Sequence, residues 1–446
     1  MPPEEFLPMA SRRFLPNLLL VLVIAVIAAV AFTFLKDMDG PTITLTPNTG
    51  RVSPQTVLEV AVEDPSGIRE LNVGTRKNNN FVSFFRKHYD GKAVRQVEQI
   101  PVRSANLAQG SFELEIRVTD ASLAGFGQGN TRTEILPMRY DARAPRISVK
   151  TMPANVWRGG ASAIRYTVDE EVVNTGVLIG GYFVPASPQA DGSYVCIYPF
   201  PFTMSAPDFK RSVALTATDL AGNVTRTRFT VMAYERNFRH DKLTLTDDFL
   251  SNAMQKLHHL APETTNPLQC YLTVNTRVRA SNMETLRELN SISAKGKLWD
   301  GNFMALPRSA ARANFADHRS LIYNGQQVSE AYHLGLDLAS VRNADIPAAN
   351  NGTVVYAAEL GIYGNVVVID HGLGVMTLYS HMSEIVVQKG QAVTKGTILG
   401  KTGTTGLAFG DHLHFGVVVG GLEVNPVEWI DAKWLANLTR RLSDQN

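Results

Sequence analysis

Cysteine is scarce in this chain of 446 residues, with Cys196 and Cys270 as the only two. Neither belongs to a CxxC pattern, so the sequence excludes a disulfide-rich scaffold and a zinc ribbon. A single disulfide between them is an alternative if the chain matures in an oxidising compartment. An excess of one charge is also missing, because 43 Lys and Arg residues stand against 41 Asp and Glu residues. Without a basic field, a nucleic-acid partner is not expected.

Near the N-terminus, charged residues are absent from the run FLPNLLLVLVIAVIAAVAFTFL at 14–35. About 20 apolar residues make a helix long enough to span the hydrocarbon core of a bilayer. Arg12 and Arg13 precede the run, so residues 1–39 are expected to be a cytoplasmic tail and a transmembrane anchor, with the bulk of the chain on the periplasmic side of the inner membrane. A cleaved signal peptide ending at AVA (29–31) is the alternative. That site lies inside the apolar run, which favours the uncleaved anchor.

Alternating apolar and polar residues dominate the part of the chain from 40 to 235. Examples are VLEVAVED (57–64), SFELEIRVTD (111–120) and SVALTATD (212–219). A period of two predicts strands with one buried face. GPTITLTP at 40–47 is matched by APRISVKT at 144–151, which indicates a repeat of about 100 residues. We therefore expect two immunoglobulin-like β-sandwiches, at 40–142 and 143–235.

The segment 236–330 changes character and is expected to be a short helical linker. Thr246 is placed to cap a helix that runs toward Pro262, and Asp247 and Asp248 would lie in its first turn. Ser281 and Glu284 form a capping box for a second helix. Residues 240–330 could also cover the groove of a domain that follows.

The C-terminal part, 331–446, is rich in strands and glycine turns. It also holds several of the ten histidines of the chain, in YHLGLDLA (332–339), LYSHMS (378–383) and DHLHFGV (411–417). If each segment is a strand, alternation places the apolar residues on one face. The opposite face then carries His333 with Asp337, Tyr379 with His381, and His412 with His414.

Imidazole and carboxylate groups that share a buried face need partners, and a divalent metal is one. Two histidines and one aspartate suit zinc and leave a coordination position open, which is the catalytic arrangement. The residues alone do not decide between His412 and His414 as the ligand. A carrier role for the lysines of VQKGQAVTKGTILG (387–400) and a metal role for His371 are not favoured.

The motifs HLGLD, TLYSHMS and GDHLHFGV resemble those of the lysostaphin-like (LytM, peptidase family M23) zinc endopeptidases, which cleave peptide cross-links of bacterial peptidoglycan. The resemblance covers about the last quarter of the chain. It implies a β-rich peptidase domain with one Zn²⁺ ion, held by His333, Asp337 and His414. It also implies that His381 and His412 are catalytic, and that a tyrosine, here Tyr323 or Tyr332, helps to hold the oxyanion.

The expected protein is therefore a mostly β, membrane-anchored zinc endopeptidase of the periplasm that acts on peptidoglycan peptide stems. Some relatives lack one or more of the five site residues and act as regulators without cutting, so a regulator of another wall hydrolase is the alternative. All five residues are present here, which favours an enzyme. The β-sandwiches could contact another envelope protein.

Overall fold

The computed structural model describes residues 14–35, 37–78, 80–151 and 155–443. The expected cytoplasmic tail, with Arg12 and Arg13, lies outside these residues. The chain forms two compact units. The first contains residues up to Ala144 together with Asp219–Asn223, and the second contains Pro145–Thr218 and Val224–Asn446.

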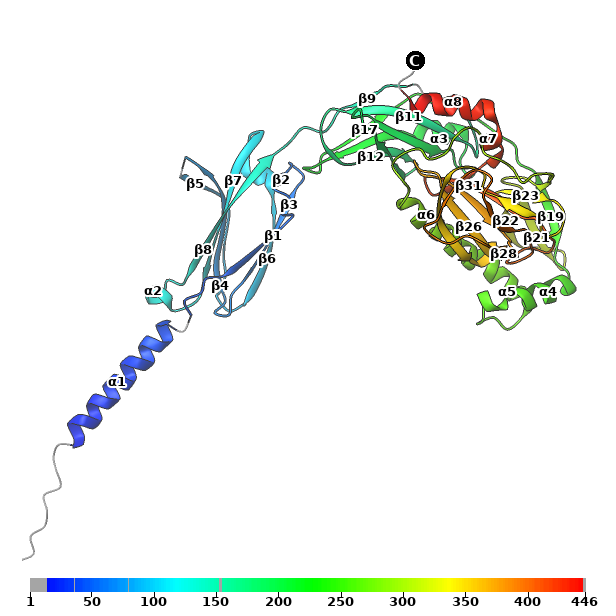
Figure 1. The fold of residues 1–446 in the computed structure, drawn as a ribbon. Coiled ribbons are helices and arrows are strands. Elements are labelled where there is room, and N and C mark those ends of the chain that lie inside the picture. The colour runs from blue at the N-terminus through cyan, green and yellow to red at the C-terminus, as the bar shows by residue number, and fades with distance from the viewer. Residues whose placement is uncertain (1–13, 36, 79, 152–154, 444–446) are drawn as a thin grey trace, which may run out of the picture. The chain divides into compact units, whose positions relative to one another are not determined.

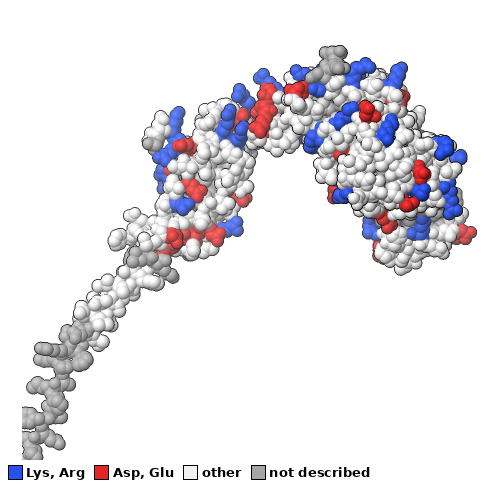
Figure 2. Space-filling view, in the orientation of Figure 1, with Lys and Arg blue, Asp and Glu red and all other residues white. Residues whose placement is uncertain are grey.

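The first unit begins with the helix α1 (Phe14–Leu35), which has no charged residue in its sequence and whose described residues are white in Figure 2. Among the described residues, no helix combines the length and the hydropathy that a bilayer crossing requires. This finding overturns the transmembrane helix in the expected fold.

Two sheets follow α1 in the first unit (Figure 1). One contains β1 (Thr42–Thr46), β3 (Val57–Glu63) and β6 (Arg95–Pro101). The other has the order β2 (Arg51–Val52), β8 (Thr131–Tyr140), β7 (Gly110–Asp120), β4 (Ile68–Lys77), β5 (Asn80–His88). Alternate residues of both sheets, such as Val60 and Ile116, are fully buried in one core. The two sheets therefore pack face to face, as the alternating pattern predicts.

The second unit opens with another pair of sheets. Their orders are β14 (Ser187–Pro188), β15 (Tyr194–Pro199), β11 (Ala161–Val168), β9 (Ile147–Val149) and β13 (Tyr182–Pro185), β12 (Val172–Ile179), β16 (Ala214–Asp219), β17 (Val224–Arg228). The strands β10 (Val156–Trp157) and β18 (Ala233–Tyr234) pair beside them, and α3 (Ala206–Ser212) precedes β16. The immunoglobulin-like topology and the boundaries at 142 and 235 stay predictions.

This second pair of sheets shares a core with the C-terminal part of the chain. Ala163 and Ile197 belong to the same buried cluster as Phe415 and Trp429. Glu428, in the first turn of the short helix α7 (Pro426–Ile430), accepts hydrogen bonds from Ala161 N at 3.2 Å and Arg236 Nη2 at 2.9 Å. The final helix α8 (Ala432–Leu442) follows directly.

The segment 236–330 contains strands as well as the expected helices. The helices are α4 (Asp247–Leu257), α5 (Pro267–Thr273), the π-helical turn η3 (Val274–Val278) and α6 (Arg279–Ser291). A three-stranded sheet has the order β19 (His240–Thr244), β21 (His318–Tyr323), β22 (Gln326–Tyr332). The expected short helices are present, and the three strands are an addition that the sequence did not predict, because β19 pairs with β21 in parallel across about 80 residues.

The two helix starts predicted in this segment have different outcomes. Thr246 caps α4, and its side chain accepts a hydrogen bond from Phe249 N at 3.2 Å, as predicted. The capping box at Ser281 was wrong, because Ser281 lies inside α6. The turn η3 joins α5 to α6 without a break, so the N–H groups near Ser281 already have carbonyl partners and need no cap.

The C-terminal part is built on an eight-stranded sheet. Its order is β20 (Ala310–Ala313), β23 (Leu336–Ala339), β31 (Leu413–Val419), β27 (Val375–Ser380), β26 (Asn365–Asp370), β25 (Gly352–Glu359), β29 (Ala392–Val393), with β32 (Leu422–Val424) also paired to β31. A smaller sheet contains β24 (Asp345–Pro347), β30 (Ile398–Lys401) and β28 (Glu384–Ile385). The short turns along the chain are α2 (Ala124–Gly127), η1 (Val102–Ala105), η2 (His258–Leu260) and η4 (Gly361–Tyr363).

The two faces of the large sheet meet different partners. On β31, Leu413 and Phe415 enter the core that the second pair of sheets shares. Val418, on the other face, packs in a cluster with Leu250 of α4 and Leu286 of α6. His414 lies between Leu413 and Phe415 and therefore belongs to the face that the helical segment covers.

Candidate metal centre

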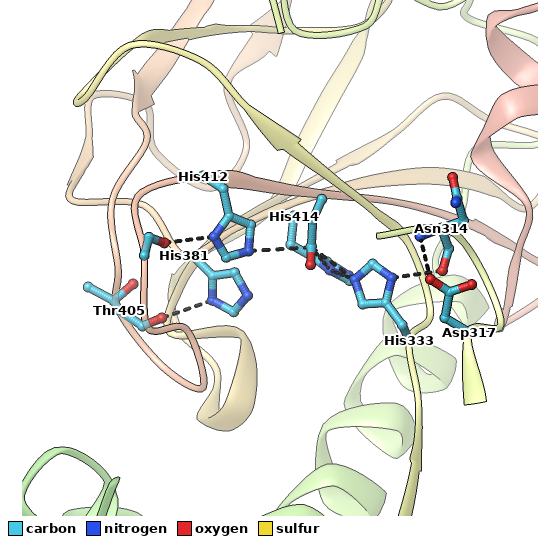
Figure 3. A network of polar contacts seen from close by, with 9 residues as sticks. Asn314, Asp317, His333, His381, Thr405, His412 and His414 are labelled. Atoms are coloured by element: carbon cyan, nitrogen blue, oxygen red, sulfur yellow. Dashed lines mark hydrogen bonds and ion pairs between the residues drawn. The ribbon is translucent and has the colours of Figure 1, made fainter. Parts of the chain in front are cut away.

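Three strands of the large sheet bring the C-terminal histidines together. Asp337 on β23 pairs with His414 on β31, and His414 also pairs with Ser380 at the end of β27. His381 follows β27 directly, and His412 precedes β31. Residues far apart in the sequence thus meet at one edge of these three strands, as Figure 3 shows.

His333, Asp337 and His414 form the tightest group. His333 Nε2 lies 2.9 Å from Asp337 Oδ1 and 2.9 Å from His414 Nδ1. His414 Nδ1 lies 3.1 Å from Asp337 Oδ1. The two nitrogen atoms and the oxygen atom are close enough together to bind one cation at the same time.

The hydrogen bonds of these residues test whether a metal fits. His333 Nδ1 donates to Asn314 O at 2.9 Å, which leaves a lone pair on Nε2. That lone pair points at the Asp337 carboxylate, an acceptor, and at another imidazole nitrogen. His414 Nε2 is buried and has no hydrogen-bond partner among the described residues. Acceptors that face one another need a cation between them, so the donor set fits a zinc ion.

The electrostatics keep these ligand candidates in the right protonation state. Burial works against the Asp337 carboxylate, but the three imidazoles of His333, His412 and His414 around it outweigh burial and hold the pKa of Asp337 well below its usual range. Burial lowers the pKa of His414 to about 4. An ionised carboxylate and a neutral imidazole are the forms that bind metal.

His381 and His412 flank this triangle. His381 Nδ1 donates to Thr405 O at 2.8 Å, and His412 Nδ1 donates to Gly410 O at 2.7 Å. Both rings therefore keep Nε2 free of backbone partners, and their centroids lie 4.9 Å apart. His412 Nε2 also lies 3.3 Å from Asp337 Oδ1. Burial holds the pKa of His381 well below its usual value.

All five predicted site residues border one cavity of about 280 Å³. Tyr332 also lines it, whereas Tyr323 does not and instead donates from Oη to Asp247 Oδ1 at 2.8 Å. His371 lies elsewhere, fully buried between Asn351 O and Thr377 Oγ1. Cys196 and Cys270 are both free and buried, so they form no disulfide.

Three details of the expected strands were wrong. His333 precedes β23 instead of lying on it, and its N–H donates to Asp317 O at 3.0 Å. His381 has a left-handed backbone with φ of 63°, which ends the alternation of β27. Tyr379 therefore does not share its face, and Tyr379 Oη accepts from Ala349 N in the core.

The groups that orient the histidines were missed by the sequence reasoning. Asn314, Thr405 and Gly410 act through backbone carbonyl oxygens, which every residue type carries, so no sequence signal marks them. Asp317 Oδ2 accepts from Asn314 N at 2.9 Å and fixes that loop.

Comparison with known proteins agrees with this geometry for one part of the chain. The profile of Peptidase family M23 matches residues 331–426. Peptidoglycan DD-endopeptidase ShyA of Vibrio cholerae is 40% identical over 98 residues, which are 22% of this chain and 23% of that protein. DD-carboxypeptidase/endopeptidase Mpg of Neisseria meningitidis is 38% identical over 95 residues, 21% of this chain and 22% of that protein. Stage II sporulation protein Q of Bacillus subtilis is 34% identical over 101 residues, 22% of this chain and 36% of that protein.

The chain thus spans between about a fifth and a third of the length of these curated relatives. The matched region contains all five predicted site residues and the strands that carry or flank them. The resemblance read from the sequence is confirmed for this region, and residues 331–426 form a Peptidase family M23 domain.

Proposed function

We propose that the chain is a zinc-dependent endopeptidase that hydrolyses peptide cross-links of bacterial peptidoglycan. The observation that carries the proposal is the triangle of His333, Asp337 and His414 beside two further histidines, whose Nδ1 atoms are bound to backbone carbonyls and whose Nε2 atoms have no backbone partner. The relative named as a peptidoglycan DD-endopeptidase supports the substrate class. The broader inference is that the M23 domain is a peptidase. The narrower inference is that its substrate is a peptide cross-link of peptidoglycan.

His333 Nε2, Asp337 Oδ1 and His414 Nδ1 would hold the zinc ion. A bound zinc ion would supply Lewis acidity toward the scissile carbonyl and toward water. Asn314 and Asp317 hold the His333 ring in place through its Nδ1–H and its backbone N–H. The ligand set has one carboxylate and two neutral imidazoles, so an ion at this site keeps a net positive charge.

His381 and His412 would move the protons of the reaction. Each donates its Nδ1–H to a backbone carbonyl, so each presents Nε2 toward the cavity. One of these nitrogen atoms takes a proton from the attacking water, and the other stabilises charge or protonates the leaving amine. Tyr332, which lines the same cavity, would help to hold the oxyanion.

The test uses purified full-length protein, its zinc content and the release of cleaved muropeptides. We expect His414→Ala to lose both zinc and hydrolysis, whereas His381→Ala keeps zinc and loses hydrolysis. Hydrolysis at the wild-type rate by His381→Ala would overturn the assignment. A wild-type chain that binds zinc but releases no muropeptide would favour the regulator of another hydrolase instead.

The proposed substrate lies outside the cytoplasmic membrane, so we propose that the chain acts there. Protection of the protein from protease in spheroplasts, whose outer membrane is opened and whose inner membrane is intact, would contradict this location. Contact of the β-sandwiches with another envelope protein stays a prediction, which crosslinking in cells would test.

A further inference from the structure

The wall of the cavity opposite the histidines comes from the segment 236–330. The helical run α5, η3 and α6 contributes Tyr271, Asn275 and Arg279 to this wall, and β21 contributes Arg319. Tyr271, Asn275 and Arg279 are spaced by four residues and therefore lie along one helix face. Two guanidinium groups thus border the same small cavity as the metal centre.

Arg279 is held in place by its own helix. Its Nε donates to Asn275 O at 3.2 Å and its Nη2 donates to Asn275 Oδ1 at 3.0 Å. Asn275 in turn donates from Nδ2 to Glu330 O at 3.0 Å, which fastens the helix to β22. The guanidinium is therefore preorganised at the cavity wall before any ligand arrives.

The positive charge at this wall has little compensation. Burial lowers the pKa of Arg279, and the neighbouring charge of Arg319 adds to the effect. The acidic group that acts on Arg279 is Glu423, but Glu423 Oε1 accepts from Tyr363 Oη at 3.0 Å, and burial raises its pKa. Within the described part of the chain, the Arg319 side chain makes no ion pair or hydrogen bond.

Arg279 and Arg319 border one cavity, and Arg319 has no partner within the described part of the chain, so an anion in the cavity would gain from both guanidinium groups. Guanidinium groups bind carboxylates through two parallel hydrogen bonds, which fix orientation as well as charge. The Tyr271 hydroxyl, on the same helix face, is a further donor for such a group. A peptide that lies across the histidines would carry its own carboxylates into this wall.

We propose that Arg279 and Arg319 form a carboxylate-binding subsite that selects peptide substrates with a free carboxylate close to the scissile bond. The inference rests on the proposed function, because it assigns the substrate class of the same site. The carboxylate belongs either to the C-terminal residue of the peptide or to an acidic side chain, and both offer the same group to the arginines.

The test compares kcat/KM of the full-length zinc-loaded protein on matched synthetic stem peptides. One peptide has both carboxylates free, a second has an amidated C-terminus, and a third has an amidated acidic side chain. We expect the wild type to prefer the free peptide over one of the amides by about 10–100-fold, mostly through KM. The amidated peptide that the wild type cleaves less efficiently than the free peptide identifies the source of the carboxylate.

Arg319→Gln should reduce that preference toward one, and Arg279→Lys should reduce it in part. Arg277→Gln is the matched control, because Arg277 is exposed in the same helical run and pairs with Glu263. A preference that persists unchanged in Arg319→Gln would overturn the subsite. Equal wild-type rates on all three peptides would overturn it as well.

Binding to the non-hydrolysing His381→Ala variant separates this inference from the proposed function. Isothermal titration should show tighter binding of the free peptide than of the amide, and Arg319→Gln placed in the same background should remove the difference. If the wild type cleaves none of the peptides but this binding difference appears, the endopeptidase proposal fails and the subsite stands. If cleavage occurs without any binding difference, the subsite fails and the enzyme stands.

Discussion

His333 Nε2 lies 2.9 Å from His414 Nδ1, although 81 positions separate the two residues in the sequence. Both atoms also face Asp337 Oδ1, so the fold holds three ligand candidates together. A ligand that binds only the folded state stabilises it, by about 2.7 kcal/mol at 100 times its dissociation constant. We therefore expect zinc to raise, and EDTA to lower, the melting temperature in differential scanning calorimetry. His414→Ala should remove the difference, and a zinc effect retained in this variant would contradict the assigned ligands.

Asp317 should control zinc affinity without touching the ion. Its carboxylate accepts from Asn314 N, and the Asn314 carbonyl orients the His333 ring. Loss of such an outer partner typically weakens metal binding by about 10–100-fold. We expect this loss for Asp317→Ala in a competition assay with a chromophoric chelator. Asp345→Ala is the control, because Asp345 is exposed and pairs with Lys401; equal affinities in both variants would refute the role of Asp317.

The helix α4 is fastened to the loop that borders the cavity. Lys256 Nζ donates to the carbonyl oxygens of Thr404 and Ala408, and the rings of Phe249 and Phe409 have centroids 4.7 Å apart. We expect Phe249→Ala to loosen this contact and to raise turnover of polymeric peptidoglycan severalfold, with a smaller effect on a short peptide. Digestion of purified sacculi beside a peptide assay measures both rates. A fall in both rates would show that α4 supports the site rather than limiting access to it.

A shortened chain that starts near residue 300 would not test whether α4 limits access to the cavity. It would remove β19, which pairs with β21, together with Arg279 of the cavity wall. Any change in rate would then mix access with loss of structure. The single substitution at Phe249 leaves the β19–β21 pairing and Arg279 in place, so it is the sharper experiment.

Alternation along β31 was enough to predict that Leu413 and Phe415 enter the core and that His414 lies on the opposite face. A strand imposes this pattern locally, because successive side chains point to opposite sides. His333 and His381 lie outside the strands, so the same rule could not place them. Their positions depend on backbone hydrogen bonds to Asp317 and Tyr363, residues that are distant in the sequence and carry no local signal.

The segment 236–330 shows the same limit at a larger scale. Caps and apolar spacing predicted α4, because a helix is stabilised by contacts within a few residues. The parallel pairing of β19 with β21 joins residues that are distant in the chain. Short strands of mixed polarity carry no sequence pattern from which this pairing could be predicted. The spacing of Tyr271, Asn275 and Arg279 can be read from the sequence. The cavity that these residues line cannot be predicted from it.

His371 should make the stability of the second unit depend on pH. Burial lowers its pKa from 6.5 to about 4. Below pH 6.5 the His371 imidazole is protonated in the unfolded chain, whereas in the folded chain it stays neutral down to about pH 4. The free energy of unfolding therefore falls as the pH decreases from 6.5 to 4. Between pH 7 and pH 5 the loss is about 2 kcal/mol.

All four tryptophans lie in the second unit, so urea unfolding followed by tryptophan fluorescence reports this unit. With EDTA present to keep metal binding out of the comparison, we expect His371→Gln to lose about 2 kcal/mol less than the wild type over this pH interval. Parallel pH profiles for the two proteins would show that His371 does not titrate in this way.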